Sequence, residues 1–307
     1  MTAPIVLRDD RWRIGVVPQI GGGLTECIFG GQPLLQRVAH RSLSSTAVEL
    51  CYFPLVPFSN RIRNSRFSFE GRTVHVRPNV PDYPHAIHGH GWLAEWRVLH
   101  ADAARCTLSF EHAASDHWPW RYRVLQTFAI GATSLTITLT LTNEATTTMP
   151  AGLGFHPFFP KPDAAHLAAN ARRLWNGPAE EFPSRSVDLP SELDFERSRP
   201  VREARGIDHC FSGWSGHAVI RWADAPYRVE LDADERLAHF LLYVPKDRDF
   251  FCLEPVSHAV NAFNFPRSEE HATLGLPPTH ELSATLAIRC ERRGSQFRRC
   301  VEHRSER

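Results

Sequence analysis

The sequence lacks the spaced cysteines and glycines that mark several common functional sites. Seven cysteines are scattered along 307 residues, their number is odd, and no two are spaced as Cys-x-x-Cys. A disulfide framework or a cysteine zinc site is therefore not expected, and buried free thiols are the remaining interpretation. The glycine run at residues 21–23 lacks the Gly-x-Gly-x-x-Gly spacing and the following helix of a dinucleotide site.

Long apolar runs and an excess of one charge are also missing. No segment approaches the ~20 apolar residues that a membrane-spanning helix needs. The first ten residues lack the basic and apolar regions of a signal peptide. Lysine and arginine number 35 against 34 aspartate and glutamate residues, which gives a formal charge of +1. We therefore expect a cytoplasmic protein, with neither nucleic acid nor a membrane as its partner.

Amphipathic helices are scarce, and alternation with a period of two takes their place. In residues 135–142 leucine and isoleucine alternate with threonine, which is typical of a strand with one face in a core. Residues 67–69 and 73–76 flank Glu70-Gly71-Arg72 and predict a hairpin. Similar patterns predict strands at residues 12–17, 107–112, 122–130, 217–222, 227–231, 240–244 and 282–288.

The number of strands and their proline- and glycine-rich connections predict an all-β fold, a large antiparallel β-sandwich. We find no linker and no repeat of fixed period, so residues 1–290 are expected to form a single domain. Residues 291–307 are rich in arginine and are predicted to be a flexible, solvated tail. By local composition alone, residues 164–175 would form a helix.

Polar residues embedded in aromatic and apolar segments mark the candidate functional site. A buried polar group costs free energy unless it is paired or functional, so its presence in such a segment needs a reason. Segments of this kind are residues 59–63, 83–92, 154–159, 207–211 and 251–255.

Each of these polar residues also has an ordinary structural explanation. Arg61 alone could form a structural ion pair, and His88 or His156 alone could be a hydrogen-bonded core histidine. Glu254 alone could lie at the surface, and Asp208 could cap a turn. Together on an all-β scaffold they predict one polar site suited to a neutral polyol. In such a site arginine and carboxylates bind hydroxyls, and aromatic rings pack on the sugar.

A metal site is the alternative for the histidine-rich segment. Residues i and i+2 of a strand share a face, so His88 and His90 could chelate a metal, with His85 and Glu95 nearby. The pattern is partly similar to the first metal motif of cupins. The glycines that flank that motif and its second half are missing, and the glycines within this segment favour a loop. We therefore predict no metal and no cofactor.

Taken in order, these segments resemble the aldose 1-epimerase (galactose mutarotase) family. That family has an Asn-Arg-Ile segment, a hairpin, an Asn ahead of a His-Gly motif, a Gly-x-His-Pro-Phe-Phe segment, an Asp with an apolar sequel, and a Leu-Glu-Pro segment with a downstream Asn. The corresponding residues here are Asn60–Ile62, 67–76, Asn79, His88-Gly89, Gly154–Phe159, Asp208–Phe211, Leu253–Pro255 and Asn261. The match covers roughly residues 16–288.

The resemblance is closest to a bacterial subgroup that carries the Pro-His-Ala-Ile-His-Gly sequence of residues 84–89. Two departures from the family pattern bear on substrate identity more than on reaction type. Gly89-His90 stands where the family usually has Gly-Gly, and Pro255 follows Leu253-Glu254, as in the less characterised branches.

The resemblance implies a galactose mutarotase-like supersandwich, in which residues 167–175 are strand rather than helix. It also implies that Glu254 is the catalytic base and His156 the acid, with His88 assisting near the ring oxygen. Arg61 and Asp208 would hold sugar hydroxyls. The remaining expected substrate-binding residues, which flank these motifs, are Asn60, His90 and Trp92.

The reaction implied is anomer interconversion of a free aldose by opening and reclosing the ring, which needs a base and an acid but no cofactor. The partner would be a small-molecule sugar, and the protein would be a monomer or a homodimer. Two alternatives stay open. Arginines at 61, 63, 66, 72 and 77 could bind the phosphate of a hexose 6-phosphate. A non-catalytic sugar-binding or sensor protein would need the contacts to hydroxyls but not the acid–base pair.

Overall fold

Strands dominate the computed structural model, which describes residues 3–40, 48–176, 182–183, 185–265 and 274–292. The helices of this described part are short 3-10 turns: η1 (Arg63–Ser65), η2 (Gly91–Leu93), η3 (Ser191–Leu193), η4 (Val201–Ala204) and η5 (Ala262–Asn264). None of them has both the length and the apolar character needed to cross a membrane. The predicted all-β class is confirmed.

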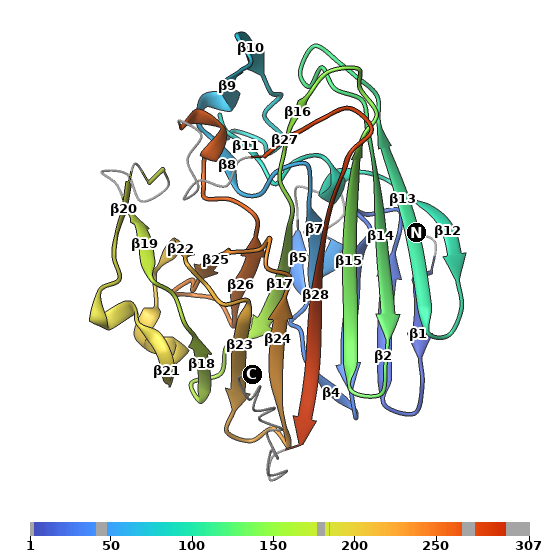
Figure 1. The fold of residues 1–307 in the computed structure, drawn as a ribbon. Coiled ribbons are helices and arrows are strands. Elements are labelled where there is room, and N and C mark those ends of the chain that lie inside the picture. The colour runs from blue at the N-terminus through green and yellow to red at the C-terminus, as the bar shows by residue number, and fades with distance from the viewer. Residues whose placement is uncertain (1–2, 41–47, 177–181, 184, 266–273, 293–307) are drawn as a thin grey trace, which may run out of the picture.

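Two large antiparallel sheets form the sandwich (Figure 1). The first sheet contains, in spatial order, β1 (Ile5–Arg8), β2 (Trp12–Val17), β3 (Gly23–Phe29), β7 (Tyr52–Leu55), β17 (Gly154–Pro160), β26 (Phe250–Val256), β25 (His239–Tyr243), β22 (Asp208–Ser212), β19 (Arg173–Asn176) and β20 (Arg185–Asp188), with β4 (Gln32–Pro33) beside β3. The second contains β12 (Arg97–Ala101), β13 (Arg105–His112), β14 (Tyr122–Ile130), β15 (Ser134–Asn143), β28 (Glu281–Arg292), β24 (Tyr227–Ala233), β23 (His217–Trp222), β18 (Ala165–Ala169) and β21 (Phe195–Pro200).

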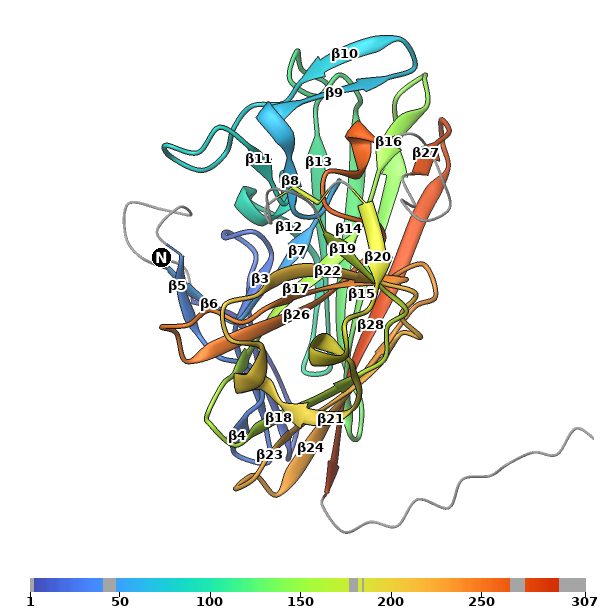
Figure 2. The same ribbon diagram turned by 90° about the vertical axis from the view of Figure 1, so that its left-hand side faces the viewer.

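Short two-stranded pairs complete the described chain. They are β5 (Val38–His40) with β6 (Val48–Leu50), β8 (Arg61–Ile62) with β11 (Ala86–Ile87), β9 (Arg66–Phe69) with β10 (Arg72–His75), and β16 (Met149–Ala151) with β27 (Leu274–Leu276). Three of the pairs, β8–β11, β9–β10 and β16–β27, gather at one end of the sandwich in both views (Figures 1 and 2). The pair β9–β10 is the hairpin predicted around Gly71.

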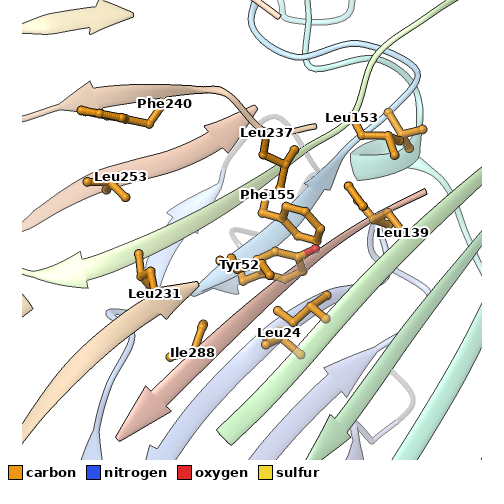
Figure 3. Packing of buried hydrophobic residues seen from close by; sticks show 14 of the residues in the cluster. Leu24, Tyr52, Leu139, Leu153, Phe155, Leu231, Leu237, Phe240, Leu253 and Ile288 are labelled. Atoms are coloured by element: carbon orange, nitrogen blue, oxygen red, sulfur yellow. The ribbon is translucent and has the colours of Figure 1, made fainter. Parts of the chain in front are cut away.

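The main core lies between the two sheets because each sheet turns one apolar face inward. In β15 the leucine and isoleucine side chains are buried, whereas threonine hydroxyls form cross-strand hydrogen bonds on the other face, such as Thr138 to Thr285 at 3.0 Å. Figure 3 shows the side chains of Leu24, Tyr52, Phe155 and Leu253 from the first sheet near those of Leu139, Leu231 and Ile288 from the second.

The central strands of the first sheet are buried on both faces, and this positions the candidate site. Every described residue of β7 and β26 is buried, as is nearly all of β17. Alternate side chains such as Phe155 and Leu253 enter the main core, while Phe158 and Cys252 belong to a second apolar cluster. Because side chains alternate between faces along a strand, this second cluster covers the opposite face of the first sheet.

The helix expected from the composition of residues 164–175 is wrong. The segment forms two strands, β18 and β19, which belong to different sheets, so the strand character implied by the resemblance is confirmed with a break in the middle. In β18 the side chains of Leu167 and Ala169 are buried, and the strand pairs with both β23 and β21. Pairing with distant strands overrides local helix propensity here.

The end of the second sheet reaches into the segment expected to be a tail. β28 continues to Arg292, which pairs with Tyr227, while Glu291 pairs with Arg228. These two residues of the expected tail are therefore strand, and residues 293–307 lie outside the described part of the chain.

Candidate active site

The pairing of β17 with β26 places His156 directly opposite Glu254 in the middle of the first sheet. Gly154 pairs with Val256 and Phe158 with Cys252, so the two polar side chains between them share one face. The distance from His156 Nε2 to Glu254 Oε1 is 3.2 Å, and the exposed fractions of the two side chains are 9% and 4%. The sheet therefore holds a nearly dry histidine–carboxyl pair whose facing atoms lie within hydrogen-bond distance.

The carboxyl of Glu254 has a strong affinity for a proton. Burial, chiefly, and the negative charge of Asp208 raise its pKa well above the ordinary range, and the positive charge of Arg61 offsets part of that effect. Its second oxygen, Oε2, has no hydrogen-bond partner among the described residues. A buried oxygen of this kind favours a ligand hydroxyl as its partner.

Aromatic rings surround the histidine–carboxyl pair. The ring of Phe53 lies 4.4 Å from that of His156 and stacks on Trp92 at 5.3 Å, measured between centroids. The ring of His88 lies 5.1 Å from that of His156 at an angle of 83°. Nδ1 of His88 accepts a hydrogen bond from the backbone N–H of Asn60 at 3.3 Å. In the neutral ring the proton is therefore on Nε2, where it can be donated.

The loop that carries His88 is fixed by its backbone. Both His88 and Gly89 have positive φ, at 61° and 72°. A Cβ on Gly89 would lie 2.0 Å from the carbonyl oxygen of Val56, so this approach needs glycine. The side chain of Asn79 donates to the carbonyl oxygens of Ile87 and Gly89 and accepts from the N–H of Ile87. Asn79 thus holds the turn that presents His88.

Arg61 and Asp208 form the polar border of the site. Arg61 Nη2 lies 3.1 Å from Asp208 Oδ2, and both side chains are partly exposed. The side-chain oxygen of Asn60 accepts hydrogen bonds from the backbone N–H and from Nη1 of Arg61. In the sheet, Asp208 pairs with Tyr243, and Tyr243 pairs with Cys252, two residues before Glu254. The structure thus places Asn60, Arg61 and Asp208 beside the catalytic candidates.

His90 has a different setting from the other expected site residues. Its Nδ1 lies 2.8 Å from the hydroxyl of Tyr122, and its ring stacks on His112 at 4.4 Å and meets Trp118 edge-on. Burial lowers the pKa of His90 to about 3, so the ring is neutral at physiological pH. The positive φ values at His88 and Gly89 separate His88 and His90, which an extended strand would have placed on one face.

The three histidines weighed as metal ligands also have separate partners. His85 Nδ1 accepts from the N–H of Asn64, while His88 and His90 bond Asn60 and Tyr122. In the described part of the chain, the group with metal-ligand spacing is instead His156, Cys252 and Glu254.

His258 supports the site and was not singled out from the sequence. Its Nε2 accepts a hydrogen bond from the N–H of Ser59, and its Nδ1 donates to the carbonyl oxygen of Ala259. Burial lowers the pKa of His258 to about 4, which keeps this arrangement at neutral pH. Asn261 supports Arg61 in the same way, by donating its N–H to the Arg61 carbonyl. A histidine in a segment bounded by Val256 and by Ala259-Val260 was the signal available for this role.

Comparison with known proteins identifies the family of the chain. The chain matches the model of the aldose 1-epimerase family over residues 5–288. It is 33% identical over 279 residues to the uncharacterised protein YphB of Escherichia coli K12, covering 88% of this chain and 93% of that protein.

Solved structures show the same architecture. A candidate aldose 1-epimerase from Escherichia coli K12 superposes with a TM-score of 0.84 and 30% identity, over 94% of this chain and 99% of that one. A galactose 1-epimerase from Lactobacillus acidophilus superposes with a TM-score of 0.74 over 94% and 93% of the two chains. At 14% identity the latter supports the fold alone.

Proposed function

This chain belongs to the aldose 1-epimerase family, and we propose that it is a mutarotase that interconverts the α and β anomers of a free aldose. The observation that carries the proposal is the His156–Glu254 pair, a buried acid and base 3.2 Å apart. In a cyclic aldose the hydroxyl oxygen and the ring oxygen are bonded to the same carbon, C1. A base for one and an acid for the other must therefore be neighbours, as these two side chains are.

The reaction follows from the proton positions. Glu254 Oε2 takes the proton of the C1 hydroxyl, the bond between C1 and the ring oxygen breaks, and that oxygen takes the Nε2 proton of the protonated His156 ring, which is left as neutral imidazole. The open aldehyde turns about the C1–C2 bond, and the same steps in reverse close the ring as the other anomer. A high proton affinity at Glu254 suits this exchange of roles. His88 Nε2 donates near the ring oxygen and stabilises its developing charge.

The direct test is a screen of anomerisation. Purified protein should speed the approach of fresh α-galactose or α-glucose to anomeric equilibrium, followed by polarimetry or proton NMR across a panel of aldoses. A protein that binds a sugar tightly without changing any rate would be a sensor or binding module, and this outcome would overturn the enzyme assignment.

Asp208→Asn should weaken substrate binding more than chemistry. A carboxylate that loses its charge binds hydroxyls less strongly and no longer holds Arg61, so we expect KM to rise about tenfold, as loss of a charged hydrogen bond would give. Removing the Asp208 charge also lowers the pKa of Glu254, so the acidic limb of the kcat profile should move to lower pH. Steady-state polarimetry from pH 5 to 8 measures both.

Asp188→Asn is the matched control, because Asp188 pairs with Arg173 at 3.0 Å at the edge of the same sheet. Unchanged KM in Asp208→Asn, or an equal rise in Asp188→Asn, would remove Asp208 from the site.

A phosphorylated aldose is the second candidate substrate, and one surface hollow favours it. The hollow has a volume of about 450 Å³ and is lined by Tyr243, Lys246, Asp247 and Arg248, among others. Because Tyr243 pairs with both Asp208 and Cys252, the hollow borders the site, and its two cations could bind a phosphate. Comparing rates on glucose and glucose 6-phosphate decides between the two.

A further inference from the structure

Three different metal-binding atoms converge at the histidine–carboxyl pair. Cys252 lies two residues before Glu254 on β26, so its thiol points to the same face of the sheet. A ring nitrogen of His156, the sulfur of Cys252 and a carboxylate oxygen of Glu254 all lie within 4.8 Å of one another, and all three residues are buried. The proposed acid–base chemistry does not require a thiol here.

The spacing suits a small tetrahedral ion. Three atoms within 4.8 Å of one another have a common point about 2.8 Å or less from each, and zinc bonds to nitrogen, oxygen and sulfur measure about 2.0–2.3 Å. Side-chain movements below about 1 Å would therefore close the coordination shell, leaving the fourth position for water or a sugar oxygen. The rigid pairing of β17 with β26 keeps the ligands together, and Glu254 Oε2 has no competing partner in the described chain.

We propose that a zinc ion binds His156 Nε2, Cys252 Sγ and a carboxylate oxygen of Glu254, and that it inhibits the protein by occupying its acid and base. Zinc binding breaks the S–H bond of Cys252 and forms an S–Zn bond, and the thiol proton goes to water. A proton held at Nε2 or Oε1 also goes to water, because both atoms then give their lone pairs to the metal. A thiolate and an imidazole select zinc over magnesium or calcium.

Direct metal binding tests the site without using any catalytic activity. Cobalt(II) replaces zinc as a spectroscopic probe, and its bond to a thiolate gives an intense charge-transfer band in the near ultraviolet. We expect this band at one equivalent of cobalt and its removal by added zinc, with no effect of magnesium. Cys252→Ser should abolish the band and raise the zinc Kd by at least about 100-fold, since loss of even an outer partner costs about 10–100-fold.

Two further variants keep the test decisive. Cys300→Ser removes a thiol that lies outside the described residues and should keep the band. Cys252→Ala replaces Cys252→Ser if the serine variant does not fold, as judged by circular dichroism. A band that survives loss of Cys252 or disappears with Cys300, or wild-type protein without a one-to-one site, would overturn the proposal.

The inhibitory part of the inference rests on the proposed mutarotase function. Saturating zinc should lower the mutarotation rate at least about tenfold, and a chelator should restore it, because the acid and base together supply about 10²–10⁴-fold. Full activity with zinc bound would refute inhibition. A Cys252-dependent cobalt band in a protein that anomerises no sugar would instead leave the metal site standing and refute the mutarotase assignment.

Discussion

Glu254→Gln should lower the mutarotation rate by about 10²–10⁴-fold, the range typical of a lost general base. Glutamine has nearly the same shape and can still accept a hydrogen bond from His156, but it cannot take the proton of the C1 hydroxyl. Polarimetry at saturating sugar measures the effect on kcat. Normal mutarotation by this variant would refute the assignment of Glu254 as the base.

The same substitution should leave the protein at least as stable as the wild type at neutral pH. Burial raises the folded-state pKa of Glu254, whereas in the unfolded chain the carboxyl loses its proton near about pH 4.3. Above that pH the unfolded state binds fewer protons than the folded state, so the carboxyl lowers the free energy of unfolding as pH rises. Glutamine removes this cost. The melting temperature of the variant should therefore exceed that of the wild type by a margin that grows from pH 4 to pH 7.

A less stable variant at neutral pH would mean that the charged pair stabilises the fold. Glu281→Gln, at the exposed start of β28, is a control for loss of a carboxylate outside the site and should leave the mutarotation rate unchanged.

His156→Asn should also lower the mutarotation rate by about 10²–10⁴-fold, because it removes the acid that protonates the ring oxygen. The variant combined with Glu254→Gln should be no slower than the slower single variant, since groups that act as one unit are not additive. Single-turnover NMR of fresh α-anomer gives the three rates. If the rate loss of the double variant equalled the product of the two single losses, the residues would contribute independently and not as one pair.

His166→Asn on β18 is the matched control for loss of a histidine. His166 is half-buried in the second sheet, and its Nδ1 lies 3.2 Å from the carbonyl oxygen of Ala164. The His166→Asn variant should keep the full mutarotation rate. If it lost as much rate as His156→Asn, the effect of His156→Asn would be due to altered folding.

Local pattern predicted several strands that have one face in the core and the other outside it. The alternating segment at residues 135–142 and the hairpin around Gly71 are both present, because a period of two is a property of neighbouring residues. For residues 164–175 the prediction from local composition was wrong, because an alanine-rich composition favours helix. Its strands are set by partners such as β23, more than 40 residues away in the chain.

The candidate site, like the fold, could be predicted only in part from the sequence. Motif order identified the family, and the family match confirms it. His90 shows the limit of sequence spacing, since the turn at His88-Gly89 gives it partners in the second sheet that the spacing did not indicate. Cys252 shows the opposite case. Its position in the sequence did not indicate a role in the site, and only the strand register places it beside His156.

The sequence by itself determined the all-β class and the family, and it singled out Glu254 as the expected base, since these depend on residue types and on short spacings. The tertiary structure alone decided which atoms of that glutamate are engaged and what surrounds them. His156 and Glu254 are nearly 100 residues apart, and they meet because β17 and β26 pair in one register. A shift of one residue would turn Glu254 into the main core, because successive side chains of a strand point to opposite faces.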